Sequence, residues 1–262
     1  MNEAFTSTEY DNLLSSILDI GECLLKNGAE VSRIEDTISR LCLAYGFDNI
    51  NVFTITSSIV VTVRRPNGRT ETQTRRIFDR NTDLGEVEKI NSLSRRVCAD
   101  PPSPARLEEM VREAENHSGD IRHLTLFTAI IYAAVSAVFA VFFGGNGADA
   151  LAASLSGIFL FAILSAGRRL RINSLLLNLI VSAFTALAVI LLMSAGIGVH
   201  ADKICIGNIM LVIPGVQLMT ALRDMINGDT LAGTLSFMEA ILKALAVAMG
   251  FAFVLISFGI RI

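Results

Sequence analysis

The chain has 262 residues, of which 52% are hydrophobic and 18% charged, and its formal net charge is −3 at pH 7. This charge offers no basic face for nucleic acid, so we do not expect nucleic acid as a partner. The four cysteines lie far apart without a CxxC pair and only three histidines accompany them, which argues against a zinc site and a disulfide framework. We expect no bound metal.

The charged residues are distributed unevenly along the chain. Residues 1–124 contain 15 Lys and Arg and 20 Asp and Glu, whereas the remaining 138 residues contain 7 and 5. This change of composition predicts a soluble N-terminal domain over residues 1–123 and a transmembrane domain over residues 124–262. The N-terminus has no basic segment followed by an apolar one, so we expect no cleavable signal peptide and a cytoplasmic location for the first domain.

The predicted soluble domain mixes helices and strands. Apolar residues recur at helical spacing in four segments, and the segment 51–64 is rich in β-branched residues, as in a strand. Pro66, Asn67 and Gly68 then predict a hairpin turn and a return strand. The predicted helices cover residues 10–26, 29–45, 84–99 and 104–116, and the return strand covers residues 69–77.

The second half predicts an α-helical bundle of about five transmembrane helices, so the fold class is a membrane protein with a mixed α/β cytosolic domain. The predicted spans cover residues 125–143, 148–166, 174–195, 204–222 and 240–260. Arg168, Arg169 and Arg171 lie between the second and third spans, whereas the loop between the first two has no basic residue. The excess of basic residues in cytoplasmic loops therefore places the arginine loop and the N-terminal domain in the cytoplasm, and the loop at His200 outside.

The fourth span contains a candidate binding site. Pro214 and Gly215 lie inside an apolar segment, where they should break or kink the helix. A broken helix directs a half-helix N-terminus and free carbonyl groups into the protein, and transporters use this geometry to hold carboxylates and ions. We expect substrate contacts from Asn208, Pro214, Gly215 and Gln217, although an ordinary proline kink packed against its neighbours explains the pattern equally well.

Ionisable residues near the last span are candidates for proton coupling or gating. Asp229 precedes the span, and Glu239 and Lys243 are four residues apart on one helix face, where they can form an ion pair. Interfacial groups that reach to water are the commoner explanation for such residues. Polar or small residues in the second and third spans fit either helix packing or a polar lining; they are Ser154, Ser156, Gly157, Asn178 and Ser182.

Two segments resemble the threonine/serine exporter family. They are NGAEVSRIEDTISRLCLAYG at residues 27–46 and PGVQLMTALRDMINGDTLAGTLSFMEAI at residues 214–241. The resemblance implies a multi-pass exporter of small amino acids in the bacterial cell inner membrane, driven by the proton gradient as an antiporter. Fused members of this family have about twice as many spans, so the resemblance also implies a larger subunit that needs a small membrane partner. Members of the split type are linked to dicarboxylates such as succinate.

Other classes of function stay open. A membrane-anchored hydrolase is one alternative, but the soluble half has no nucleophile beside an identifiable base, so we expect no enzyme. A ligand sensor that signals through the spans is another, and a homo-oligomer is compatible with each class. The leading expectation is a transporter of a small-molecule substrate, an amino acid or a dicarboxylate, without a cofactor.

Overall fold

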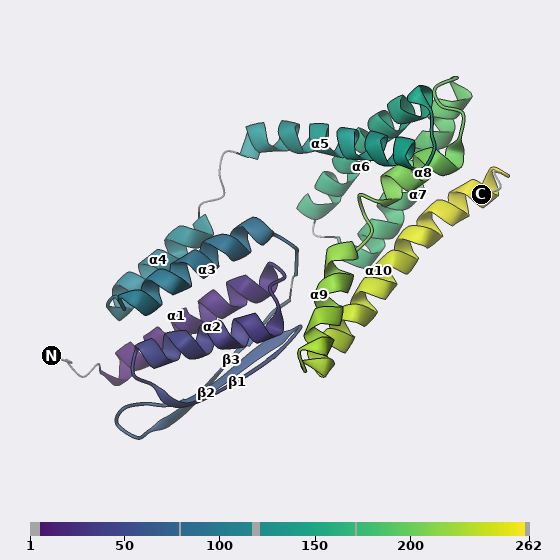
Figure 1. Ribbon diagram of the computed structural model, residues 1–262. Helices are drawn as coiled ribbons and strands as arrows, with labels where there is room; N and C mark the ends of the chain where they lie inside the picture. Colours follow the sequence, from purple (N-terminus) through teal and green to yellow (C-terminus); the bar gives the residue numbers. More distant parts are fainter. Residues whose placement is uncertain (1–5, 79, 117–120, 171, 260–262) are drawn as a thin grey trace. The chain divides into compact units, whose positions relative to one another are not determined.

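The structure is a computed structural model that describes residues 6–78, 80–116, 121–170 and 172–259 (Figure 1). It is mostly helical, with one small three-stranded sheet. The chain divides into two compact units. Unit 1 comprises Met1–Ser118 and Val216–Met238, and unit 2 comprises Gly119–Gly215 and Glu239–Ile262.

Four helices of unit 1 lie close to their predicted positions, namely α1 (Ser7–Lys26), α2 (Val31–Ala44), α3 (Leu84–Ala99) and α4 (Pro104–Asn116). Local signals explain the boundaries of α1. Thr6 and Glu9 form a capping box at its start. Gly28 follows its end with a φ of 84°, a left-handed conformation that favours glycine.

The sheet differs from the prediction because the segment 51–64 contains a hairpin and is not one strand. Strand β1 (Asp48–Ile55) pairs antiparallel with β2 (Ser58–Arg64), which pairs antiparallel with β3 (Thr70–Arg76). Ile55 lies opposite Ser58, so the chain turns within Thr56 and Ser57. That turn has no glycine, asparagine or proline, the residues that usually mark a hairpin, and the prediction missed it for this reason. The return strand at residues 69–77 is confirmed.

The core of unit 1 lies between the sheet and its helices. Ile59, Val61 and Val63 alternate along β2 and are fully buried, together with apolar residues of α1 and α2. Helices α1 and α2 cover this face of the sheet (Figure 1). Strand β3 is polar throughout, in agreement with its position at the sheet edge.

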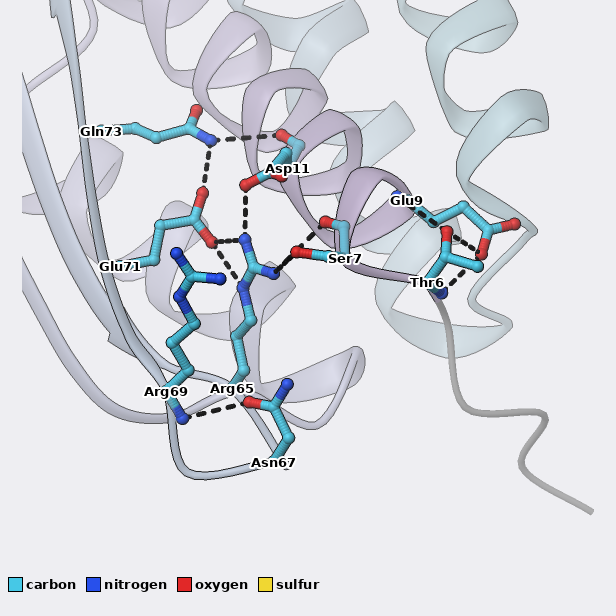
Figure 2. Close-up of polar contacts among 9 residues, drawn as sticks. All are labelled: Thr6, Ser7, Glu9, Asp11, Arg65, Asn67, Arg69, Glu71 and Gln73. Carbon is cyan, nitrogen blue, oxygen red and sulfur yellow. Dashed lines mark hydrogen bonds and ion pairs between the residues drawn. The ribbon is translucent and has the colours of Figure 1, made fainter.

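A buried arginine fastens the turn between β2 and β3 to α1. Arg65, which is 2% exposed, forms ion pairs with Asp11 and Glu71 (Figure 2). Its Nη1 also donates to the Ser7 carbonyl at 3.2 Å, and its guanidinium lies over the Tyr10 ring. Because its charge is matched by two carboxylates, this residue can be buried without an uncompensated charge.

Unit 2 consists of α5 (Ile121–Phe142), α6 (Gly147–Arg169), α7 (Ser174–Ser194), α8 (Ala201–Ile209) and the larger part of α10 (Thr230–Ser257). Within the described residues, α6, α7 and α10 are long and apolar enough to cross a membrane, and α5 has a shorter apolar segment, Leu126–Phe142. Large apolar side chains remain exposed along these helices, including Phe142 and Phe253. Such a surface fits lipid better than water.

The last two predicted spans correspond to helices of the structure, with other boundaries. The segment 204–222 contains the expected break, because α8 ends at Ile209 and α9 (Gly215–Ile226) begins after an interruption. The fifth predicted span overlaps α10, which starts ten residues before residue 240, at Thr230, directly after the polar turn at residues 223–229. Residue 260 and Arg171 lie outside the described residues.

Candidate functional site

The interruption between α8 and α9 forms where the sequence places Pro214 and Gly215. The helical hydrogen-bond pattern gives way to tighter turns, in which the Leu211 N–H donates to the Asn208 carbonyl at 3.1 Å and the Val212 N–H to the Ile209 carbonyl at 3.0 Å. Pro214 has no N–H with which to continue the ladder. The predicted break is therefore present in the structure.

Asn208, one of the predicted substrate contacts, is completely buried in α8. Its Nδ2 donates to Ser156 Oγ of α6 at 2.8 Å and to the Ile204 carbonyl at 2.9 Å. Ser156 Oγ lies 2.8 Å from the Ala152 carbonyl, to which it can donate. The amide of Asn208 thus connects α8 to α6 in the interior of unit 2.

Two polar atoms beside this contact have no hydrogen-bond partner among the described residues. They are Asn208 Oδ1 and the hydroxyl of Ser136 in α5, which is also completely buried. A Cβ added at Gly207 would lie 2.5 Å from the Ser136 carbonyl oxygen, and one at Gly157 would lie 3.0 Å from Ser136 Cβ. Ser136, Ser156 and Asn208, which we call the Asn208 cluster, therefore gather where three helices approach closely.

The two atoms without a hydrogen-bond partner, Asn208 Oδ1 and Ser136 Oγ, could form hydrogen bonds with a bound molecule. A buried acceptor without a donor costs roughly 1–3 kcal/mol. A small polar molecule could remove this cost by donating to Asn208 Oδ1 and by exchanging a hydrogen bond with the Ser136 hydroxyl. Ammonium and hydroxyl groups have suitable donors.

A second polar contact lies on the same face of α6, seven residues before Ser156. Asp149, completely buried, accepts hydrogen bonds at Oδ1 from the Val199 and His200 N–H groups at 2.7 and 2.9 Å. Its Oδ2 accepts from the Asn146 N–H at 2.9 Å and lies 2.7 Å from His200 Nδ1. The carboxylate thus holds the loop before α8 against the start of α6. The local sequence does not reveal this contact; the only signal is that Asp149 is one of five acidic residues after Leu124.

The other predicted substrate contacts have different surroundings. Pro214 lies in the interruption, and Gly215 begins α9, where an added Cβ would meet no described atom within 4 Å. Gln217 Nε2 donates to the Ser236 carbonyl of α10 at 3.4 Å. The described hydrogen bonds therefore link Asn208 and Gln217 to two different helices, α6 and α10.

The predicted coupling residues lie at two places along the chain. Glu239 and Lys243 form the expected ion pair, with Oε1 and Nζ 2.7 Å apart. Asp229 precedes α10, where its N–H donates to the Asp224 carbonyl and its own carbonyl accepts from the Gly233 N–H, both at 2.9 Å. Their roles in proton coupling or gating stay predictions.

A further buried carboxylate, which the sequence analysis did not select, lies beside Asp229 in unit 1. Asp224, in the last turn of α9, is 2% exposed, and its Oδ1 accepts a hydrogen bond from the Val31 N–H at 3.2 Å. Burial raises the pKa of Asp224 to about 6, and the charges of Asp229 and Glu30 add to this effect. Nothing in the local sequence marks this residue, because its contact is made with a segment 193 positions away.

The apolar helices and the buried polar groups between them define a helical membrane protein. The sequence model of the ThrE family, described as "Putative threonine/serine exporter", matches residues 15–257. The chain therefore belongs to the threonine/serine exporter family, over nearly its whole length. Neither the curated proteins nor the solved structures gave a match.

Proposed function

We propose that this protein exports a small carboxylate-bearing metabolite, threonine or serine in the first place, by secondary active transport across the bacterial inner membrane. The Asn208 cluster is the observation that carries the proposal. It supplies a buried acceptor and a buried hydroxyl, both open, in the family whose members are described as exporters of these amino acids. Threonine and serine each carry an ammonium group and a hydroxyl that can complete such hydrogen bonds.

The interruption before α9 is the proposed moving part. Export would proceed by alternating access around it, because a broken helix can rearrange without losing a continuous ladder of backbone hydrogen bonds. Pro214, Gly215 and Gln217 are the proposed contacts of the substrate carboxylate, which the N-terminal end of a half-helix favours.

The proposed topology follows from the distribution of charge. The domain of residues 1–123 lies in the cytoplasm, five segments of residues 124–262 cross the membrane, and Arg168 and Arg169 mark a cytoplasmic loop. Protons entering from outside would drive efflux as an antiport, with Asp229, Glu239 and Lys243 as coupling or gating residues.

The proposal includes a second, small membrane subunit. Its basis is the likeness to split members of the family, in which a smaller protein supplies the remaining spans. A dicarboxylate such as succinate is the alternative substrate within this proposal. The two substrates differ in chemistry, because a dicarboxylate has no ammonium group for Asn208 Oδ1 to accept from.

The test is efflux from cells that lack their own exporters and are preloaded with threonine, serine or succinate. The chain is expressed alone and beside a small membrane partner, with and without an uncoupler. We expect uncoupler-sensitive efflux of threonine or serine that depends on the partner. Efflux of succinate alone would select the alternative substrate. No efflux of any of the three, with both proteins present in the membrane, would contradict transport and favour a hydrolase or a sensor.

A further inference from the structure

Asp224 occupies a position that a helix cap normally fills. Val31 is the first residue of α2, and Glu30, the N-cap residue, makes no side-chain hydrogen bond to this helix end. The first N–H groups of a helix need acceptors from outside the helix. Asp224 provides one from α9, so a residue close to the broken span holds the start of α2.

Two further contacts connect the same parts of unit 1. Arg223 forms an ion pair with Glu30, and Arg80 Nη1 donates to Ser236 Oγ of α10 at 3.3 Å. Together with the contact of Asp224 and Val31, they dock α9 and the start of α10 on the α/β part of the unit. We call this contact the Asp224 latch.

The charges around the latch are predominantly negative. Glu30 and Asp229 both oppose ionisation of Asp224, whereas Arg80 favours it. Glu35, farther along α2, accepts the Thr54 N–H at 2.7 Å, and burial together with the charge of Asp229 raises its pKa as well. The charged groups facing the latch are Glu30 and Glu35 from α2, Arg80 from the segment before α3, Arg223 from α9, and Asp229 from the turn before α10.

The sign of the effect follows from linkage. A carboxyl group whose pKa is raised by docking binds a proton more tightly in the docked state, so the proton in turn strengthens docking. Docking is therefore strongest when Asp224 is neutral, and it weakens as the pH rises from about 4 to above 6, because the buried carboxylate ionises among like charges.

We propose that Asp224 is a proton-binding residue of the transport cycle, and that proton uptake there tightens the Asp224 latch on α9, the helix that follows the interruption. The step adds one proton from water to the carboxylate and gives a neutral acid; its loss to water reverses the step. This inference rests on the proposed proton-coupled export. It adds Asp224 to the candidate coupling residues, and it makes the docking of α9 on the α/β part of unit 1 depend on a proton.

The first test measures transport by the full chain in proteoliposomes, with its partner if efflux requires one. Asp224→Asn cannot exchange the proton, so we expect threonine or serine efflux driven by a pH gradient to fall about tenfold or more, while exchange of substrate without a gradient stays within about twofold of wild type. Asp224→Glu should restore driven efflux with a shifted pH profile. Asp36→Asn, an exposed carboxylate paired with Arg40, is the control and should change neither assay.

Two results of the transport assays would overturn the inference. Driven efflux by Asp224→Asn within twofold of wild type would show that the proton binds elsewhere. Loss of driven efflux and exchange together, in both Asp224→Asn and Asp224→Glu, would show that Asp224 only maintains the structure.

A second test does not depend on transport. Cysteines replace Glu30 and Arg223 in a Cys98→Ser background, because Cys98 is the most exposed of the cysteines and the other three are buried. A bifunctional thiol reagent then crosslinks the two new cysteines when the latch is docked. The crosslinking yield of the protein with Asp224 is compared with that of Asp224→Asn at the same pH, so that the pH dependence of the thiol chemistry cancels. We expect the Asp224 protein to crosslink several-fold less than Asp224→Asn at pH 7.5 and equally at pH 5. An equal ratio at both pH values would refute the latch, even if the chain exports threonine; the expected ratio in a protein that exports nothing would instead contradict the proposed function alone.

Discussion

At the scale of single residues, Asn208 is a buried side chain of unit 2 whose two polar atoms differ in their hydrogen bonds. Its Nδ2 is satisfied by Ser156 and by the Ile204 carbonyl, whereas its Oδ1 has no donor among the described residues. A purely structural amide would be expected to use both ends. Oδ1 is therefore the atom to which the substrate would donate in the proposed site.

Replacing Asn208 tests whether the Asn208 cluster takes part in transport. We expect Asn208→Ala to lower threonine or serine efflux about tenfold or more, because it removes the acceptor together with the link to Ser156. Asn178→Ala in α7, where the side chain is only partly buried, is the matched control and should retain efflux. The measurement is the initial efflux rate, normalised to the amount of protein in the membrane. Equal rates for the two variants would exclude the Asn208 cluster as the binding site.

Asp149 is expected to matter for stability first. Asp149→Ala removes the acceptor of three backbone N–H groups and the partner of His200 Nδ1. The donors belong to exposed residues, so water can replace part of these hydrogen bonds. The expected loss is on the order of 1–3 kcal/mol, seen as a lower midpoint of thermal unfolding in detergent. Asp202→Asn, an exposed carboxylate paired with Lys203, should leave the midpoint unchanged. An unchanged midpoint for Asp149→Ala would mean that the loop before α8 does not need this carboxylate.

At the scale of helices, glycines set how closely α5 and α8 can approach. A Cβ at Gly207 would lie 2.5 Å from the Ser136 carbonyl oxygen and 3.1 Å from the Ala140 backbone nitrogen. Backbone atoms cannot move aside as the end of a flexible side chain can. The contact between these helices therefore requires glycine at this position.

Two glycine substitutions distinguish packing from transport. Gly207→Leu should separate α5 from α8 and lower the amount of folded protein, measured by size-exclusion chromatography in detergent. A Cβ added at Gly215 meets no described atom within 4 Å, so the Gly215→Leu protein should fold. The larger side chain at the first residue of α9 should nevertheless reduce efflux. Wild-type efflux by folded Gly215→Leu would count against substrate binding at the interruption.

The helices that sequence predicts well are those with local boundaries. Leu84–Ala99 matches its prediction because Asp83 caps its start and prolines follow its end. The hairpin at Thr56 and Ser57 is not evident from the sequence, because its turn has no glycine, asparagine or proline. The position of Asn208 before Pro214 marks it as a candidate in the sequence. Its hydrogen-bond partner Ser156, and Ser136 close to Gly207, are more than 50 residues away, so spacing along one helix cannot reveal them.

For the molecule as a whole, the contact between Glu30 and Arg223 joins segments 193 residues apart. The two segments that resemble the exporter family each contribute one residue to this ion pair: Glu30 belongs to residues 27–46 and Arg223 to residues 214–241. Sequence alone could identify the two segments but not their contact. The Glu30–Arg223 ion pair thus brings the two segments together within unit 1.

Charge reversal tests this contact in the full chain. Arg223→Glu or Glu30→Arg alone replaces an attraction by a repulsion, and both together restore opposite charges. Because the pair is partly exposed, we expect a coupling of about 0.5–1 kcal/mol, or about 1–4 °C in the midpoint of thermal unfolding, with each single variant less stable than the double variant. Arg106→Glu, which breaks an exposed pair within α4, is the control and should show no coupling to Glu30→Arg. Additive effects of the two reversals would mean that Glu30 and Arg223 do not meet in the folded protein, and the Asp224 latch would then lose one of its three contacts.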